Sequence, residues 1–457
     1  MHPIFVNPDE PSVPILFVTA ATFDKATEII DDRERTFLRA SGYEPKPGRY
    51  LAVPGPDGKL AGVLFGLETP DAPVQDPFRP GQLVTLLPPG TYRFANAPHD
   101  ARLAALAFAL GAYQFTRYRK AEARQVRLVL PDGVDGEDLT RIAEGVALAR
   151  DLINTPSNDM GPAELEDAAR ALAKQHGAKA DVTAGKALEK GFPLVHAVGA
   201  GSARKPRLID ITWGDAADPK ITLVGKGVCF DTGGLDIKND TGMLNMKKDM
   251  AGAATALALA HMIMARKLKV RLRVIIPAVE NSISGTSFRP RDIYTSRKGI
   301  SVEIGNTDAE GRLILADALT LADEDKPALI ADFATLTGAA RVALGPDVPA
   351  AFTDDDALAD ELARCAAVEN DPLWRMPLWR PYEAMLDSKV ADTNNVSTGG
   401  HGGAITAALF LRKFVAAKSW LHLDIFAWTP AAKPGRPEGA ELQSARALYA
   451  LLCARYA

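Results

Sequence analysis

The chain has 457 residues, a formal net charge of -4 and a sequence pI near 6.0. Hydrophobic residues make up 47% and charged residues 24%, which is the balance of a globular protein and excludes a disordered or fibrous chain. A protein that mainly binds nucleic acid usually carries a basic surplus, so this charge argues against such a partner. The length exceeds one ordinary hydrophobic core and predicts two domains.

Cysteine content and hydropathy bear on the compartment. The three cysteines, Cys229, Cys365 and Cys453, give no disulfide framework and fit a reducing compartment. The first residues lack the basic and then apolar order of a secretory signal. The longest apolar run, 251–265, contains His261 and is too short to span a bilayer. We therefore expect a cytoplasmic protein with no membrane partner.

The first 135 residues alternate strand-like and helical patterns. Apolar residues at helical spacing predict a helix over 101–118, and the turn signal Pro131-Asp132-Gly133 ends this part of the chain. No cluster of metal ligands or nucleophiles occurs here, so we expect residues 1–135 to form a smaller α/β domain without the catalytic site. Strands are predicted at 14–20, 50–54, 62–67, 84–87 and 125–130.

A long helix over 135–152 follows and stops before Pro156, because proline cannot continue a helix. We predict that residues 136–160 connect two domains. Residues 161–457 alternate strands and helices, which predicts a larger α/β catalytic domain with a central, mostly parallel but mixed sheet flanked by helices. Strands are predicted near 182 and at 208–213, 221–225, 270–279, 301–304, 329–336 and 421–426. Helices are predicted at 162–175, 250–266, 313–323, 355–368, 404–417 and 441–456.

Two loops of the second domain gather charged side chains between a strand and a helix. Each loop begins where an apolar strand ends. In open parallel sheets, the carboxyl ends of the strands form the edge where ligands bind, so we expect the loops to meet in a functional site. The charged residues of the two loops are Lys226, Asp231, Lys238 and Asp249, followed by Asp308, Glu310 and Arg312.

The four carboxylates of these loops need a cationic partner if they lie together. A salt-bridge network with the two lysines and the arginine is one explanation. A metal site is the other. Nearby glycines permit close backbone approach, and Asp308 and Glu310 at i, i+2 share one face of an extended segment. Two divalent ions bridged by carboxylates form a hydrolytic centre, and such ligands suit Zn, Mn, Co or Mg without choosing among them.

Other catalytic motifs give no rival site. The seven histidines are scattered, with no HExxH run and no Cys–His cluster. Segment 225–227 lacks the Walker spacing, and no Gly-x-Ser-x-Gly elbow occurs. We expect His401 to be solvated in its glycine-rich loop, His422 to bond within the sheet, and Cys229 to be a small buried side chain.

The second charged loop resembles the signature of the leucine aminopeptidase family of two-metal metallopeptidases. The spaced charges of the first loop match the other metal-site motif of that family. The similarity runs from about residue 150 to the end of the chain, whereas the first 135 residues match loosely. The signature reads Asn306-Thr307-Asp308-Ala309-Glu310-Gly311-Arg312-Leu313, and further similar segments are 150–156, 334–339, 391–395 and 422–425.

The resemblance implies five ligands for two metal ions, with Asp231 and Glu310 contacting both ions. We expect Mn or Zn ahead of Mg or Co. Lysine ligates only as the neutral amine, because an ammonium has no free lone pair. Its reference pKa near 10.4 must therefore be overcome, and lysine pKa values do shift in such sites. The implied ligands are Lys226, Asp231, Asp249, Asp308 and Glu310.

The resemblance also implies a mechanism. Two metal ions bind the free amino group of a peptide and activate the attacking water. Lys238 polarises the scissile carbonyl and stabilises the developing oxyanion. Arg312 holds a bicarbonate that serves as general base, together with the backbone near Leu336. The family assembles as homohexamers, so we expect an oligomer that releases amino-terminal residues from short peptides.

The side-chain pocket implied by the resemblance maps to Met246, Thr335, Gly338 and the segment that follows Ile425. The family usually has a small residue followed by glycine there, whereas this chain has Phe426-Ala427-Trp428. Bulky aromatic side chains would reshape the pocket, so a preference for leucine does not follow. A glutathione-derived Cys-Gly substrate remains open.

Two alternative functions stay open on the sequence alone. One is a two-metal hydrolase of phosphate esters, against which both retained lysines argue. The other is a non-catalytic scaffold or nucleic-acid binder on the same fold. The full set of ligands, with Lys238 and Arg312, argues against loss of catalysis.

Overall fold

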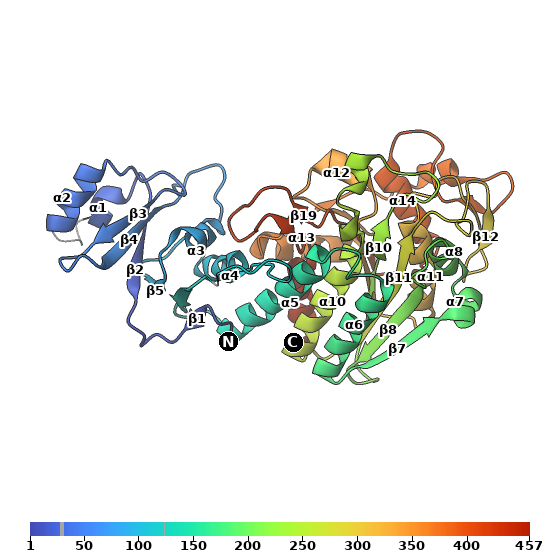
Figure 1. The fold of residues 1–457 in the computed structure, drawn as a ribbon, viewed down its shortest axis with the longest axis horizontal. Helices are drawn as coiled ribbons and strands as arrows, with labels where there is room; N and C mark the ends of the chain where they lie inside the picture. The colour runs from blue at the N-terminus through green and yellow to red at the C-terminus, as the bar shows by residue number, and fades with distance from the viewer. Residues whose placement is uncertain (28–31, 123) are drawn as a thin grey trace. The chain divides into compact units, whose positions relative to one another are not determined.

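The computed structural model describes residues 1–27, 32–122 and 124–457, and the chain divides into two compact units (Figure 1). The first unit comprises residues 1–147 and 429–438, and the second comprises 148–428 and 439–457. The domain limits inferred from the sequence, 1–135, 136–160 and 161–457, stay a prediction. Among the described residues, no helix is long and apolar enough to cross a membrane.

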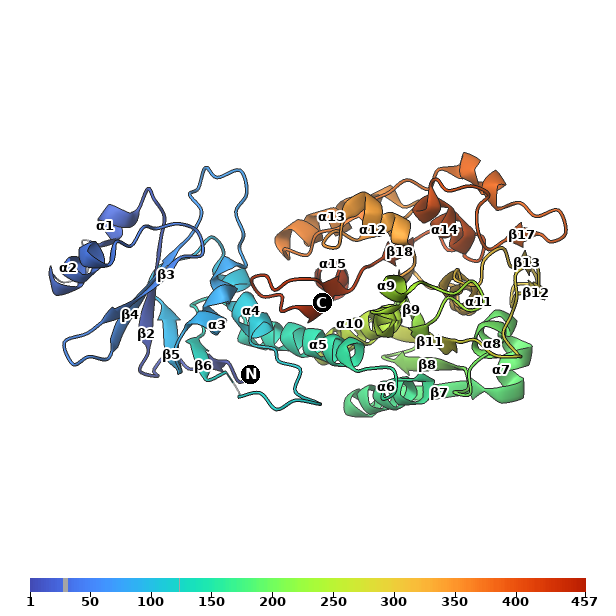
Figure 2. The ribbon, with the colours of Figure 1, turned by 45° about the horizontal axis from the view of Figure 1, so that its top comes forward.

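The first unit is built on a six-stranded sheet in the order β1-β6-β5-β2-β4-β3. Every neighbouring pair is parallel except β3 and β4, and Figure 2 shows the strands side by side. The apolar run of β2 explains why this strand is central, since its last four residues are buried. The strands are β1 (Phe5–Val6), β2 (Val13–Val18), β3 (Tyr50–Pro54), β4 (Leu60–Gly66), β5 (Gly90–Phe94) and β6 (Val126–Val129).

Short helices pack around this sheet. Helix α4 begins where the Asp100 side chain accepts a hydrogen bond from the Leu103 N–H, an N-cap that fixes its first turn. Residues 429–438 return to this unit, where the Arg436 guanidinium lies 5.6 Å from the centre of the Phe78 ring. The helices are α1 (Phe23–Thr27), α2 (Asp32–Ser41), the 3-10 helix η1 (Arg79–Gln82), α3 (Leu83–Leu86) and α4 (Ala101–Gly111).

Two sequence predictions in this unit are wrong. Residues 84–87 were expected to form a strand, but they belong to α3 and its C-cap. Pro80 lies in the first turn of η1, which leads directly into α3. Leu83 and Val84 are buried beside α4, so this short apolar run forms the buried face of a helix. The strand of this region is β5, a few residues later. The helix predicted over 101–118 ends at Gly111.

The second unit contains a nine-stranded mixed sheet. Its order is β16-β15-β18-β14-β9-β11-β8-β7, and β10 also pairs with β11. The central neighbours β18, β14, β9 and β11 are parallel, whereas β15, β8 and β7 add antiparallel pairs. The strands are β7 (Lys179–Ala184), β8 (Arg207–Trp213), β9 (Lys220–Gly225), β10 (Gly227–Asp231), β11 (Arg271–Asn281), β14 (Leu329–Ala334), β15 (Ala350–Phe352), β16 (Trp374–Arg375) and β18 (Trp420–Asp424).

Helices cover both faces of this sheet. Helices α6, α10 and α15 pack together on one face, and α8, α11 and α14 pack together on the other. The α/β fold with a smaller first unit and a larger second unit is therefore confirmed. The helices are α5 (Gly136–Asn154), α6 (Pro162–His176), α7 (Gly185–Gly191), α8 (Pro193–Gly199), α9 (Asp240–Met243), η2 (Met246–Met250), α10 (Ala251–Arg266), α11 (Gly311–Glu324), α12 (Gly338–Leu344), α13 (Asp356–Val368), η3 (Arg380–Leu386), α14 (Gly403–Arg412) and α15 (Ala445–Tyr456).

Two small sheets complete the list of strands. Strands β12, β13 and β17 form a three-stranded sheet beside the second charged loop, and β19 pairs with β20. The strands are β12 (Ile293–Thr295), β13 (Ser301–Glu303), β17 (Thr393–Asn394), β19 (Trp428–Thr429) and β20 (Gly439–Ala440).

Helix α10 lies unusually close to the central strands. Its sequence is dominated by alanine, glycine and other small residues, and residues from Ala251 to Met264 are all buried. A Cβ on Gly252 would lie 2.0 Å from the Phe333 carbonyl oxygen of β14, so only glycine fits there. This close approach brings the start of α10, with the η2 turn before it, against the sheet edge.

Three parallel strands end together at that edge. Gly225 of β9 aligns with Phe333 of β14, and Ala334 aligns with Asp424 of β18. The residues that follow these strands therefore emerge side by side, as the carboxyl edge of a parallel sheet requires. This register places Lys226, Thr335 and Phe426 around one region.

A buried polar group ties β14 to β18 behind this edge. Asp332 accepts a hydrogen bond from Trp420 Nε1 at 2.8 Å and contacts His422 Nδ1 at 2.6 Å. All three side chains are essentially inaccessible to solvent. His422 thus bonds within the sheet, as predicted. Burial lowers the pKa of His422, but the Asp332 carboxylate outweighs burial and raises it.

We predict that Asp332→Ala lowers the free energy of unfolding by about 3–5 kcal/mol, because it leaves buried donors of Trp420 and His422 without their partner. Urea unfolding followed by tryptophan fluorescence measures the change. The control is Asp360→Ala on the exposed side of α13, which should change stability by no more than about 0.5 kcal/mol. Equal stability of the two variants would contradict the assignment.

Candidate active site

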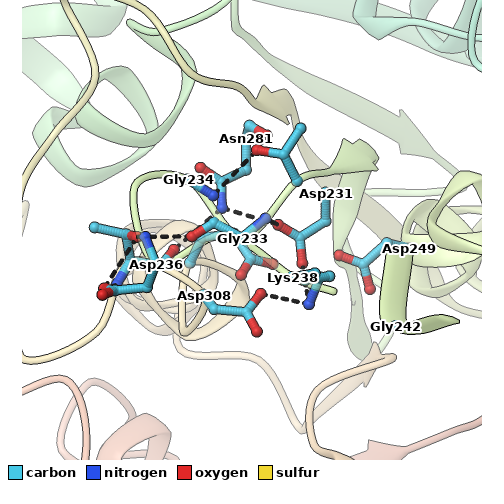
Figure 3. Close-up of polar contacts among 12 residues, drawn as sticks. Asp231, Gly233, Gly234, Asp236, Lys238, Gly242, Asp249, Asn281 and Asp308 are labelled. Carbon is cyan, nitrogen blue, oxygen red and sulfur yellow. Dashed lines mark hydrogen bonds and ion pairs between the residues drawn. The ribbon is translucent and has the colours of Figure 1, made fainter. Parts of the chain in front are cut away.

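The structure brings the four predicted carboxylates together at the sheet edge, and Figure 3 shows three of them, Asp231, Asp249 and Asp308. Asp231 ends β10, and Asp249 lies in η2. Asp308 and Glu310 lie in the loop between β13 and α11. Oxygen atoms of Asp231, Asp308 and Glu310 lie within 4.8 Å of one another. Segments far apart in the sequence thus converge on one acidic cluster.

Two lysines link the acids in pairs. Lys226 Nζ lies 2.9 Å from Asp249 Oδ2 and 2.8 Å from Glu310 Oε1. Lys238 Nζ lies 2.9 Å from Asp231 Oδ2 and also donates to Asp308 Oδ1. Both ion-pair sets are largely buried, so the interactions are only weakly screened by solvent.

The two lysines do not balance the charge of the four acids. Burial and the neighbouring Asp249 raise the pKa of Asp231 to about 7. Burial and the neighbouring Asp231 also raise the pKa of Glu310 well above its usual value. Burial would raise the pKa of Asp249 as well, but Lys226 outweighs it and lowers that pKa. The cluster is therefore short of positive charge, which is the electrostatic condition of a cation site.

Two oxygen atoms in the cluster test whether a metal would fit. Asp249 Oδ2 and Glu310 Oε1 are buried and make no hydrogen bond, although both lie within ion-pair distance of Lys226 Nζ. The Lys226 ammonium donates instead to the Thr335 carbonyl oxygen at 3.0 Å. The two oxygens therefore share one ammonium as their cationic partner, and clustered carboxylate oxygens of this kind suit a hard divalent cation.

Hydrogen bonds from Asn281, Thr307 and Asn395 hold the two charged loops in place. Asn281 at the end of β11 donates from Nδ2 to Asp231 Oδ1 and to the Thr307 carbonyl oxygen. Thr307 donates from Oγ1 to the Gly233 carbonyl oxygen, which joins the two charged loops. Asn395 donates from Nδ2 to the Asn306 carbonyl oxygen. The sequence analysis missed Asn281, for which an amide after an apolar strand was the signal, whereas Thr307 and Asn395 lie in segments that carry the family resemblance.

The structure explains why residue 311 of the second loop is a glycine. A Cβ at this position would lie 2.6 Å from both Cε and Nζ of Lys226. Any larger residue would therefore push the lysine away from Asp249 and Glu310. The glycine is required by the passage of the Lys226 side chain across the start of α11.

Arg312 lies at the rim of the same cluster. One of its terminal nitrogens donates to the Asn395 carbonyl oxygen at 2.7 Å, and its Nε is buried without a hydrogen bond. Burial lowers the pKa of Arg312 to about 10, so the side chain is a cation at neutral pH. The Leu336 N–H, expected to share an anion with Arg312, donates to Asp424 Oδ1 at 2.9 Å.

A cavity of about 780 Å³ opens next to the cluster. The predicted side-chain pocket residues line it together with all of the predicted catalytic and ligand residues except Glu310, which is buried and pairs with Lys226. A reactive cluster and a substrate-sized cavity therefore share one wall. The pocket residues are Met246, Thr335, Gly338 and Phe426.

The Phe426 turn has a conformation that glycine would adopt more easily. Ala427 has a φ of 57°, in the left-handed region that costs a residue with a Cβ roughly 1–2 kcal/mol. Gln443 Oε1 accepts hydrogen bonds from both the Phe426 and Ala427 N–H groups, at 3.0 and 2.8 Å. Gln443 thus holds the aromatic ring in the cavity wall despite the strained backbone.

Lys248 is a cavity residue that the sequence analysis overlooked. Its side chain is 5% exposed, and its Nζ lies 4.6 Å from the centre of the Phe426 ring. Burial lowers the pKa of Lys248 to about 8. The Arg341 guanidinium also lies over this ring, at 5.2 Å. The position of Lys248 directly before the predicted ligand Asp249 was a signal that could have found it.

Two further residues fall outside the site. His401 is exposed in its loop, as predicted. Cys229 is completely buried, and burial raises the pKa of its thiol, so it is a small core side chain.

Comparison with known proteins gives family matches over most of the chain. A model described as the cytosol aminopeptidase family, catalytic domain, matches residues 147–449, and a model of the M17 aminopeptidase N-terminal domain matches residues 13–131. A probable cytosol aminopeptidase of Roseiflexus castenholzii is 43% identical over 350 residues, which cover 72% of each chain. Another, from Methylobacterium radiotolerans, is 40% identical over 418 residues, covering 85% of this chain and 82% of the relative.

Solved structures agree with these matches. The crystal structure of a cytosol aminopeptidase from Coxiella burnetii has a TM-score of 0.94 and 45% identity, covering 99% of this chain and all of the other. The bottromycin maturation enzyme BotP in complex with Mn has a TM-score of 0.87 and 33% identity, covering 97% of this chain and 99% of the other. The resemblance seen in the two charged loops is confirmed, and the chain belongs to the cytosol aminopeptidase family of metallo-aminopeptidases.

Proposed function

We propose that the acidic cluster holds two divalent metal ions and that this centre removes amino-terminal residues from short peptides. The observation that supports it best is the excess of buried carboxylate charge over lysine charge at the sheet edge. Asp231 and Glu310 would contact both ions, with Asp249, Asp308 and Lys226 completing the set. Lys226 would bind as the neutral amine. Mn in the BotP complex supports Mn here, with Zn next and Mg or Co as further candidates.

When bound, the ions would activate the attacking water and polarise the scissile carbonyl. Lys238 would act directly on the substrate. Its Nζ lies at the cavity wall between Asp231 and Asp308, so it can donate to the oxygen on which negative charge develops. The peptide's amino group would lie at the acidic cluster. The side chain of the amino-terminal residue would then point toward Met246 and Phe426.

Arg312 would hold an anionic general base, for which bicarbonate is the candidate. Its unused buried Nε and its positive charge support an anion at this point. The Leu336 N–H would have to exchange its Asp424 partner for the anion. The base would then take the proton from the attacking water and deliver it toward the leaving amine.

The alternative functions are not favoured. The family match covers both charged loops, and the relatives are named aminopeptidases, so a phosphate-ester hydrolase has no support of its own. A non-catalytic scaffold or nucleic-acid binder would not need the complete cluster with Lys238 and Arg312 beside it.

The proposed site predicts different outcomes for two substitutions. Glu310→Gln should reduce bound metal and lower kcat by at least about 100-fold, because the variant loses a ligand charge. Lys238→Met should lower kcat by roughly 100- to 1000-fold while metal content stays the same, because it removes only the oxyanion donor. Metal-stripped protein, with Mn or Zn restored, would be assayed by mass spectrometry of metals and by hydrolysis of aminoacyl-anilides.

The control is Lys186→Met on the exposed surface of α7, which should leave metal content and kcat unchanged. Full activity in both site variants would show that the cluster is not the catalytic centre. An inactive wild-type protein with metal bound would overturn the proposed activity.

Gly311→Ala tests the role of Lys226 without altering a ligand. The added Cβ would lie 2.6 Å from Lys226 Nζ, so metal affinity should fall by roughly 10- to 100-fold. Competition with a fluorescent chelator measures the affinity. Gly285→Ala is the matched control, because its Cβ would meet nothing within 4 Å. Unchanged affinity in Gly311→Ala would argue that Lys226 does not bind metal.

We further propose a homohexamer. Exposed apolar side chains such as Val342, Leu244 and Ile237 support burial of part of the surface by other copies. Sedimentation equilibrium should return a mass near six times the 48.8 kDa of one chain. A monomer mass over the micromolar range would contradict the proposal.

A cytoplasmic location is proposed on two grounds. The three cysteines are free, which suits a reducing compartment. The relatives are named cytosol aminopeptidases.

A further inference from the structure

The cavity beside the acidic cluster contains a buried cation that the proposed chemistry does not use. In the part of the chain that the structure describes, the Lys248 ammonium makes no hydrogen bond and no ion pair, although the residue is only 5% exposed. The ammonium group lies over the Phe426 ring, with Nζ 4.6 Å from the ring centre. A cation–π contact compensates only part of the loss of hydration.

The surroundings of Lys248 leave this positive charge facing the cavity. Arg341 brings a second cation to the same ring, at 5.2 Å. Asp424, the carboxylate that lines the cavity outside the proposed ligand set, already accepts hydrogen bonds from Leu336 N, Thr337 N and Thr337 Oγ1. This end of the cavity therefore has cationic donors in excess of acceptors.

The location of Lys248 identifies which part of a substrate would meet it. Lys248 lies in η2 between the pocket residue Met246 and the ligand Asp249, and its ammonium contacts the ring of Phe426. Met246 and Phe426 are the residues proposed to surround the side chain of the amino-terminal residue. A group that reaches Lys248 through this pocket is thus the end of that side chain.

We propose that Lys248 is a specificity-determining residue that pairs with the side-chain carboxylate of an acidic amino-terminal residue, so that peptides beginning with Glu or Asp are a preferred substrate class. A carboxylate supplies both the charge and the hydrogen-bond acceptors that the ammonium lacks. Phe426 lines the cavity with its ring against the ammonium, and Gln443 holds the Phe426 backbone in place. This inference rests on the proposed aminopeptidase function.

The test compares glutamyl- and glutaminyl-anilides, which have nearly the same shape and differ in charge. Neither carries a terminal carboxylate, so the side chain is the only anion that Lys248 can meet. The wild-type, metal-loaded enzyme should have the larger kcat/KM for the glutamyl substrate. In Lys248→Met the ratio of glutamyl to glutaminyl kcat/KM should fall roughly 10- to 100-fold, the effect of losing a charged hydrogen bond. The ratio is independent of the fraction of folded enzyme.

Two variants control for structural effects. Lys248→Arg keeps the charge and should retain most of the glutamyl preference. Lys247→Met removes a lysine one position away, whose Nζ donates to the Asn154 carbonyl oxygen outside the cavity wall, and should leave the ratio unchanged.

Three results would count against the proposal. Wild-type enzyme that cleaves glutaminyl- and methionyl-anilides but prefers them to glutamyl-anilide would overturn it and leave the aminopeptidase function intact. A glutamyl preference that survives in Lys248→Met would assign the selectivity to another residue. Failure to cleave any anilide in the panel would overturn the aminopeptidase proposal, and this inference with it.

Discussion

Negative charge concentrated at the edge of a parallel sheet is the constraint around which the second unit is organised. Asp231, Asp308 and Glu310 have oxygen atoms within 4.8 Å of one another, and Asp249 shares the Lys226 ammonium with Glu310. The repulsion among these acids is strong because most of the group is buried. Lys226 and Lys238 reduce it without cancelling it. The surrounding chain therefore has to hold the acids against their own repulsion, which the Asn281 and Asn395 amides do by fixing the loop backbones.

Part of this cluster could be predicted from the sequence because it follows from strand direction. Lys226 directly follows β9 and Asp231 ends β10, so both emerge at the carboxyl edge of the parallel strands. Asp308 and Glu310 follow β13 of the small three-stranded sheet instead, so strand direction in the main sheet does not place them. The short helix α3 could not be predicted in this way, because an apolar run of four residues has no distinguishable period. Lys248 was also missed. Its importance depends on contact with Phe426, which is remote in sequence and approaches only through β18.

The reactive cluster and the side-chain pocket have different structural origins. The cluster depends on backbone geometry, where Gly252 and Gly311 permit approaches that a Cβ would block. The pocket depends on side chains of η2 and of the turn after β18, which Gln443 holds from a distant segment. Changes in the pocket can therefore occur while the position of the reactive groups stays the same. This separation explains how the residues of the proposed pocket, such as Phe426 and Lys248, can vary while the acidic cluster stays unaltered.

The return of residues 429–438 to the first unit has an evolutionary and practical consequence. Gly435 and Arg436 pack against Phe78 and Ala107, so part of the core of that unit is encoded near the other end of the gene. A single crossover or truncation near residue 147 would separate this segment from its partners. The first unit is thus not a module that recombination can exchange in one step, and a chimera would need both segments from the same parent.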